Sequence, residues 1–163
     1  MIQSKQDLLN LIKTKGLVIK PFKKEYLGPV GMDLTLEKSG LNPDSNKEVN
    51  LTDTPLRPNE LILVNSVEYL HLPNYLVGKI VNRSSVARLG VLVSLNADLV
   101  EPNFSGKLTF TIKNLSNREI WLKPGLRIAQ LTLEEISSPQ MEVKVLRYNY
   151  KNPEESDLCE EMV

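Results

Sequence analysis

From residue 17 onward the chain is built of short apolar runs, which are separated by polar residues and in many places by proline or glycine. Runs of this length, rich in valine, isoleucine and leucine and bounded by turn residues, are typical of strands. They predict strands over residues 17–19, 32–36, 61–64, 69–72, 76–81, 91–95, 107–113, 119–122, 127–135 and 141–148. Many short strands at close spacing favour a sandwich or a barrel. The pattern therefore predicts a mainly β fold.

Only the N-terminal segment has a helical period. Ser4 can cap a helix because Asp7 stands three residues later, and apolar residues then recur at helical spacing over residues 8–12. Gly16 offers the left-handed conformation at which a helix ends. Residues 40–60 are polar and contain three prolines, which predicts a surface loop. We expect one short helix ahead of the strands.

The length of 163 residues corresponds to a single domain, which we place over residues 1–150. Residues 151–163 read KNPEESDLCEEMV. Like charges repel one another there and little apolar surface is available for packing. This segment predicts an acidic, flexible C-terminal tail.

Cysteine use and hydropathy bear on the cellular compartment. Cys159 is the single cysteine, which excludes an intramolecular disulfide, and no Cys/His cluster has the spacing of a zinc site. No apolar stretch approaches the roughly 20 residues of a membrane helix, and the N-terminus lacks the features of a secretory signal. We expect a cytoplasmic protein without a membrane partner.

The charge balance limits the choice of partner. The chain has 20 lysines and arginines against 20 aspartates and glutamates, so it has no global basic field. Non-specific nucleic-acid binding requires such a field, and we expect no nucleic-acid partner. Any polyanion must be bound by a local cluster of donors.

The segment NRSSVARLG, at residues 82–90, is the strongest candidate for such a cluster. It places the Ser84 and Ser85 hydroxyls beside Arg83, with Arg88 following, and this combination of donors suits a phosphate chain. The alternative is a helical turn with a serine as its cap and the final glycine as its stop. On this segment alone the helical turn is the better interpretation, because short Ser/Arg motifs often match by chance.

A second segment, NADLVEPNFSGKL at residues 96–108, carries Asp98 and Glu101 in a turn-rich stretch. An exposed carboxylate there can act as a general base or anchor a metal. The alternative, a pair of solvated turn residues, is favoured when the segment is taken alone. Asp33 lies between apolar neighbours and Arg127 opens a predicted strand, and we interpret both as structural supports.

Taken in order, these segments resemble the dCTP deaminase and trimeric dUTPase superfamily. The resemblance covers residues 5–136 and rests on KPF, GMDLTL, the long run LHLPNYLVGKIVNRSSVARLGVLVSLNADLVEPNFSGKL, and RIAQL. The long run is similar to the deaminase branch, and RIAQL is similar to the fourth dUTPase motif. Several ordered motifs are more specific than any single one, so the resemblance reverses the preference for the structural alternatives.

The resemblance implies a distorted jelly-roll β-barrel and a homotrimer with active sites between subunits. It implies a deoxynucleoside triphosphate as ligand, dUTP first among them, with Mg²⁺ on its phosphates and no metal site on the protein. Arg83, Ser84 and Ser85 would hold phosphate oxygens, and the expected catalytic residues are Glu101, Arg88 and Ser84. The other expected substrate-binding residues are the base-reading turn Asn96, Ala97 and Asp98, then Phe104 against the sugar, and Gln130.

Two departures from the family bear on the activity. The deaminases carry a glutamate on the strand after the glycine turn, and Thr111 stands in its place in KLTFTIKN. A threonine hydroxyl has no useful pKa for relaying protons, so this change predicts that deamination is lost. Glu101 stands where the family has an aspartate, so an acid is retained. The family has a C-terminal arm that closes over the phosphates, and the acidic tail has no counterpart to it. Tyr148, Tyr150 and Lys151 are the candidate substitutes for this arm.

The resulting prediction is a dUTP diphosphatase that converts dUTP and water to dUMP and pyrophosphate, with Glu101 positioning the water. Two alternatives stay open. One is a dCTP deaminase that uses another proton relay and releases ammonia. The other is a non-catalytic, regulatory deoxynucleotide-binding protein.

Overall fold

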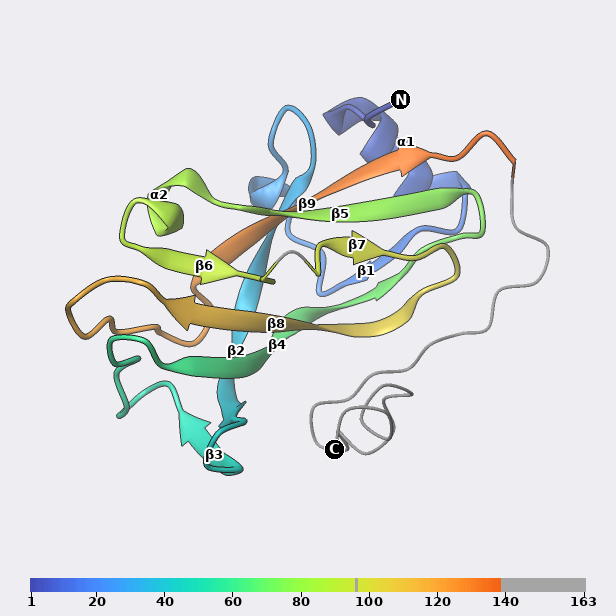
Figure 1. Ribbon diagram of the computed structural model, residues 1–163. Coiled ribbons are helices and arrows are strands. Elements are labelled where there is room, and N and C mark those ends of the chain that lie inside the picture. The colour runs from blue at the N-terminus through green and yellow to red at the C-terminus, as the bar shows by residue number, and fades with distance from the viewer. Residues whose placement is uncertain (96, 139–163) are drawn as a thin grey trace.

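The computed structural model describes residues 1–95 and 97–138, and its strands lie over most of the apolar runs (Figure 1). Asn96, the predicted strand over residues 141–148 and the acidic tail lie outside the described residues. The elements are α1 (Lys5–Thr14), β1 (Val18–Lys20), the 3₁₀ turn η1 (Lys24–Tyr26), β2 (Met32–Asn42), β3 (Lys47–Asn50), β4 (Leu61–His71), β5 (Leu76–Asn82), α2 (Ser84–Ala87), β6 (Val91–Val93), β7 (Leu99–Val100), β8 (Ser105–Asn114) and β9 (Arg127–Glu135).

The strands pair antiparallel in the order β6-β8-β4-β2-β9-β5-β7, with β1 added to β4 and β3 to β2. Strand β2 belongs to both halves of this sheet, because residues 32–35 pair with β9 and residues 36–41 pair with β4. Both pairings contain a register shift, an irregularity of the kind that bends a strand. In Figure 1, β2 runs steeply across the flatter strands of both halves. The result is a curled antiparallel half-barrel, which confirms the mainly β fold with a short N-terminal helix.

Alternate residues of the strands fill the interior of the half-barrel. Strand β4 is the clearest case, since every second side chain from Ile62 to Leu70 is buried. Phe110 of β8 is 1% exposed and packs in the same core. The alternation of apolar and polar residues in β4 therefore indicates which of its side chains lie on the inner face of the sheet.

A buried carboxylate joins β4 to β2. Glu68 is 1% exposed and accepts hydrogen bonds from the backbone N–H and the hydroxyl of Thr35, at 2.9 and 2.7 Å. Ser66 donates to the Glu68 carbonyl at 2.6 Å, and the Leu108 N–H donates to the Ser66 hydroxyl at 2.9 Å. These bonds satisfy polar groups that would be costly to bury unpaired. The two bonds from Thr35 tie β2 to β4, and the bond from Leu108 to Ser66 ties β4 to β8.

Helix α1 begins and ends where the sequence predicts. The Ser4 hydroxyl accepts a hydrogen bond from the Asp7 N–H, and the Asp7 carboxylate accepts one from the Ser4 N–H, which together form a capping box. Hydrogen bonds from the Ser4 hydroxyl and then from its N–H lower the pKa of Asp7. The chain leaves the helix through Gly16, whose φ is +82°. Leu8 and Leu11 anchor the helix in the core.

The predicted strand over residues 119–122 and the predicted loop over residues 40–60 differ in the structure. Residues 119–122 keep alternating burial, with Trp121 55% exposed, but they form only an isolated bridge between Ile120 and Leu56 and no strand. A segment with alternating burial forms a strand only when a neighbouring strand pairs with it along its length. Residues 40–60 are only partly a loop, because β2 runs on to Asn42 and pairs with β3.

Within the described part of the chain, no helix combines the length and the apolarity that a membrane crossing requires.

Candidate active site

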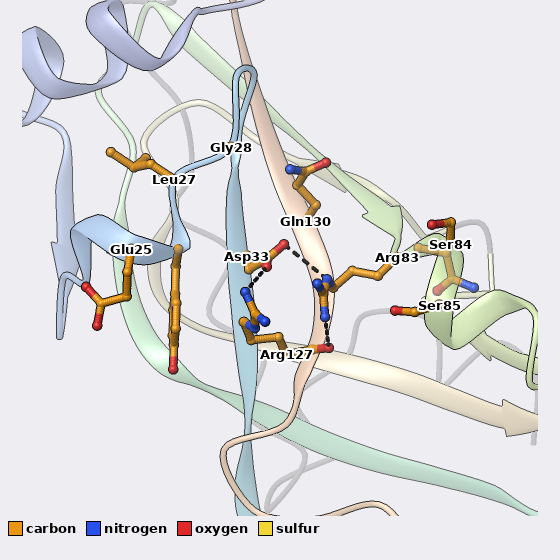
Figure 2. Close-up of a pocket in the computed structure, with 11 residues that line it drawn as sticks. Glu25, Leu27, Gly28, Asp33, Arg83, Ser84, Ser85, Arg127 and Gln130 are labelled. Carbon is orange, nitrogen blue, oxygen red and sulfur yellow. Dashed lines mark hydrogen bonds and ion pairs between the residues drawn. The ribbon is translucent and has the colours of Figure 1, made fainter.

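A cavity of about 480 Å³ opens where β2, β9 and β5 lie side by side, next to η1 and α2 (Figure 2). We call it the β9 cavity. Four of the residues that the sequence predicts to bind substrate line it, namely Arg83, Ser84, Ser85 and Gln130. The remaining lining residues are Glu25, Tyr26, Leu27, Gly28, Asp33, Asn82 and Arg127.

The strand order explains why residues far apart in sequence meet in this cavity. Strand β9 lies between β2 and β5, and Gln130 of β9 is the register partner of Asp33 on one side and of Val81 on the other. Arg83 directly follows β5, so its side chain reaches across β9 toward Asp33, as Figure 2 shows. The cavity is therefore a product of long-range strand pairing.

Asp33 is the centre of the charged contacts. Its Oδ1 lies 3.2 Å from Nε of Arg83, and its Oδ2 accepts a hydrogen bond from Nη1 of Arg127 at 3.2 Å. Arg83 also donates from Nη1 to the carbonyl of Arg127 at 3.1 Å. The Asp33 side chain is 12% exposed, whereas those of Arg83 and Arg127 are 27% and 44% exposed. The carboxylate thus orders two guanidinium groups that remain accessible to a ligand.

Ser84 and Ser85 open the single helical turn α2, and both are exposed. The turn itself matches the structural alternative for this segment, but Arg83 is its cap position and no side chain caps it. Neither serine hydroxyl has a hydrogen-bond partner among the described residues. Figure 2 shows Ser85 turned toward the arginines. Two hydroxyl groups are therefore available to a ligand at the edge of the cavity.

Arg88 does not line the β9 cavity. It lies with Arg118 and Ser116 on a separate depression of about 380 Å³, next to the exposed Leu89. Gly90 closes α2 with a φ of +83°. Within one chain, the two arginines of the NRSSVARLG segment therefore face different hollows.

The carboxylate predicted to position water also lies outside the cavity. Glu101 follows β7 with an exposed side chain, and its carbonyl accepts the N–H of Phe104 at 3.1 Å. Phe104 is half-buried against the core. Ala97 is exposed, and Asp98 is half-buried, with its carbonyl accepting the Ile80 N–H at 2.8 Å. Within one chain, Glu101, Phe104, Ala97 and Asp98 therefore lie apart from the predicted residues that line the β9 cavity.

Thr111, the residue that departs from the deaminases, lies on β8 beneath a strained turn. It is half-buried, and its carbonyl accepts the N–H of Ser94 at 2.8 Å. Ser94 and Leu95 have φ angles of 73° and 43°, which are not compatible with a strand. Strand β6 therefore ends at Val93, two residues earlier than the sequence predicts. Such backbone strain concentrates at functional sites. The hydrogen bond between Ser94 and Thr111 joins the residues that precede the expected base-reading turn to β8.

Sequence reasoning missed Tyr26, which lines the cavity from η1. The ring centroid of Tyr26 lies 5.5 Å from the guanidinium carbon of Arg127 and 4.9 Å from Nζ of Lys23. Both distances fall within the roughly 6 Å typical of cation–π contacts. The only signal in the sequence is the polar run KKEY at residues 23–26, which no pattern distinguishes from an ordinary surface turn.

The cavity does not provide a protein cage for a metal. Across residues 1–95 and 97–138, no three His, Cys, Asp or Glu side chains come together in a way that could hold a metal ion. The Asp33 carboxylate already contacts two arginines, and Glu25 points away from Asp33 in Figure 2. Mg²⁺ commonly binds through substrate phosphates with few protein ligands.

Comparison with known proteins assigns the family. Residues 2–136 match the dCTP deaminase-like family. The chain belongs to this family. Relatives named "dCTP deaminase, dUMP-forming" include the protein of Corynebacterium glutamicum, 31% identical over 157 residues that cover 85% of this chain and 83% of the relative. The protein of Salinispora arenicola is 32% identical over 158 residues, which cover 85% of this chain and 82% of the relative.

Solved structures share the fold of this deaminase-like chain. The dCTP deaminase of Agrobacterium tumefaciens matches with a TM-score of 0.70 and 19% identity, covering 83% of this chain and 49% of the other. This chain therefore spans about half the length of that deaminase chain. The EIAV dUTPase matches with a TM-score of 0.56 and 17% identity, covering 78% of this chain and 95% of the other. This chain thus shares its fold with both structures.

Proposed function

We propose that this dCTP deaminase-like protein converts a pyrimidine deoxynucleoside triphosphate to dUMP and pyrophosphate. The observation that carries the proposal is the β9 cavity, where Arg83, Arg127 and the hydroxyls of Ser84 and Ser85 lie together. Guanidinium groups beside neutral donors suit the oxygens of a phosphate chain. Relatives at 31% and 32% identity carry "dUMP-forming" in their names, which supports the same product here.

The arginines would bind phosphates without first rearranging. Asp33 holds Nε of Arg83 and Nη1 of Arg127, which leaves Nη2 of each guanidinium without a partner among the described residues. Donors that are ordered in advance stabilise developing negative charge at no reorganisation cost. We therefore assign Arg83, Ser84 and Ser85 to phosphate binding, with Gln130 and Arg127 beside them.

In the proposed reaction a water oxygen bonds to the α-phosphorus while the bond to the bridging oxygen of the β-phosphate breaks, and pyrophosphate leaves with that oxygen. Glu101 accepts the proton of the attacking water as a general base. Because Glu101 and Arg88 lie outside the β9 cavity of their own chain, the proposal needs a second copy. We propose a homotrimer in which Glu101 of one subunit faces phosphates held by another.

Mg²⁺ belongs to this proposal as an ion carried by the nucleotide. It would be held by phosphate oxygens and would neutralise part of their charge. The residues Arg83, Ser84 and Ser85 would then orient the phosphate chain for the water that Glu101 positions. Phe104 and the turn of Asn96, Ala97 and Asp98 stay assigned to the sugar and the base.

Two observations favour different substrates. The names of the relatives favour dCTP, so they support deamination, the alternative that the sequence left open, over simple dUTP hydrolysis. Thr111 favours dUTP, because no acid stands at that position of β8 to relay protons to the base. Formation of dUMP from dCTP requires both removal of the amino group and cleavage of the triphosphate, whereas dUTP requires only cleavage.

One incubation separates these substrates. The purified protein with Mg²⁺ is given dCTP or dUTP, and dUMP, pyrophosphate and ammonia are quantified. We expect dUMP and pyrophosphate from dUTP; ammonia from dCTP would add the deaminase activity. Binding of either nucleotide without product would support the regulatory alternative, and neither binding nor product would overturn the proposal.

Glu101→Gln should lower the rate of pyrophosphate release by about 100-fold or more, because the amide cannot accept a proton from water. Glu101→Asp, which restores the family's residue, should keep most of the activity. Stopped assays of dUMP formation measure both variants against the wild type. If the glutamine variant turned over as fast as the aspartate variant, Glu101 would have no role in positioning water.

A further inference from the structure

The charges that line the β9 cavity cancel. Arg83 and Arg127 are balanced by Asp33 and Glu25, and no other residue of the lining carries a formal charge. A polyphosphate carries several negative charges, so a cavity with no net charge attracts it poorly. Further cations at the border of this cavity would therefore strengthen its attraction for a polyphosphate.

Lys23 is the cation that the structure brings to this border. Its Nζ lies 4.9 Å from the ring centroid of Tyr26 and donates a hydrogen bond to the Tyr26 hydroxyl at 3.3 Å. The same ring lines the cavity, and its centroid lies 5.5 Å from the guanidinium carbon of Arg127. One aromatic ring thus holds two cations from segments about a hundred residues apart in sequence.

We propose that Lys23 is a further phosphate-binding group of the β9 cavity and that Tyr26 is a positioning residue that holds Lys23 and Arg127 beside it. The ligand is a polyphosphate, and the group recognised is a terminal phosphate of the nucleotide or the same group in free pyrophosphate. This inference rests on the proposed function, since it names an additional contact for the same phosphates. It turns a neutral cavity into one with an excess of positive charge.

The neighbouring lysine provides a matched control. Lys24 has the same charge and lies next to Lys23 in sequence, but it makes no ring contact within the described residues. If proximity of charge alone mattered, Lys23→Met and Lys24→Met would have equal effects. If the ring positions the cation, only Lys23→Met weakens binding strongly.

The experiment measures binding of inorganic pyrophosphate to the full chain by isothermal titration calorimetry at low and moderate salt. We expect Lys23→Met to weaken binding about fivefold, with a smaller salt dependence, and Lys24→Met to change it by less than about twofold. Tyr26→Leu should weaken binding about tenfold because two cations lose their support, whereas Tyr26→Phe keeps the ring and should stay within about threefold of wild type. In turnover, Lys23→Met should raise KM and leave kcat unchanged.

Each outcome decides the inference. Equal effects of Lys23→Met and Lys24→Met, or of Tyr26→Leu and Tyr26→Phe, would overturn it. If Tyr26→Leu did not fold, the lysine pair would decide alone. Wild-type protein that formed dUMP while Lys23→Met bound pyrophosphate normally would leave the proposed function standing and remove Lys23 from it. If the wild-type protein did not bind pyrophosphate, both the role of the cavity in phosphate binding and this inference would be overturned.

Discussion

Replacing Arg83 with glutamine is expected to lower kcat/KM for dUMP formation by about 100-fold while the protein stays folded. The Arg83 side chain is ordered by Asp33 through Nε and by the Arg127 carbonyl through Nη1. Its remaining nitrogen, Nη2, would meet a phosphate oxygen without further reorganisation. Removing one such donor typically costs about 100-fold to 1000-fold in rate. Steady-state kinetics with the substrate identified by the incubation measure this loss.

Arg57→Gln is the control for this variant, because Arg57 is exposed and does not line the β9 cavity. Both variants should melt close to the wild type. Asp33 is buried but keeps Arg127 as a partner, so its carboxylate is not left unpaired, and the Arg83 side chain is itself 27% exposed, which limits the cost of losing its contacts. Equal kinetics in the two variants would exclude Arg83 from phosphate binding.

Gly31→Ala should reduce the free energy of unfolding by about 3 kcal/mol, from left-handed strain and a backbone clash together. Gly31 has a φ of +83°, and a Cβ there would lie 2.5 Å from the carbonyl oxygen of Leu131 on β9. Since that oxygen belongs to the backbone, β2 and β9 must move apart to make room. For a chain of this size the melting temperature should fall by roughly 10 °C. Thermal and denaturant unfolding measure the change.

Gly16→Ala isolates the clash from the conformational strain. Gly16 has a φ of +82°, close to that of Gly31, but a Cβ there would meet nothing within 4 Å. We expect this variant to lose only about 1 kcal/mol. Because Asp33 lies two residues beyond Gly31, Gly31→Ala should also weaken pyrophosphate binding, whereas Gly16→Ala should not. Equal losses of stability in the two variants would contradict a tight contact between β2 and β9.

The elements predicted well are those that short-range pattern controls. Strand β9 spans Arg127–Glu135, as its alternation predicts, and the Ser4 cap begins α1 where expected. The failures lie where a partner strand decides. Residues 119–122 alternate like a strand but meet only a bridge, and residues 40–60 contain a strand because β2 extends to pair with it. Strand propensity depends on what lies across the ladder.

For the site, the order of the motifs along the chain identified the candidate phosphate donors, but it did not predict how these residues are arranged in space. Arg83, Ser84, Ser85 and Gln130 were predicted as substrate-binding residues, and the structure brings all four to one cavity. Their role in binding substrate stays a prediction. Tyr26 carried no signal, because an aromatic residue in a polar turn acquires a role only when Arg127 folds against it.

Local pattern was sufficient for the mainly β class and the N-terminal helix, because these depend on neighbours a few residues apart. The candidate phosphate donors were identified only by the resemblance of several ordered motifs over residues 5–136. Long-range pairing alone places Asp33 and Val81 on either side of Gln130, which brings Arg83 to Asp33 and separates Arg88 and Glu101 from that cavity. The physical reason is register: it is set by packing of whole strands against the core, and no single segment contains that information.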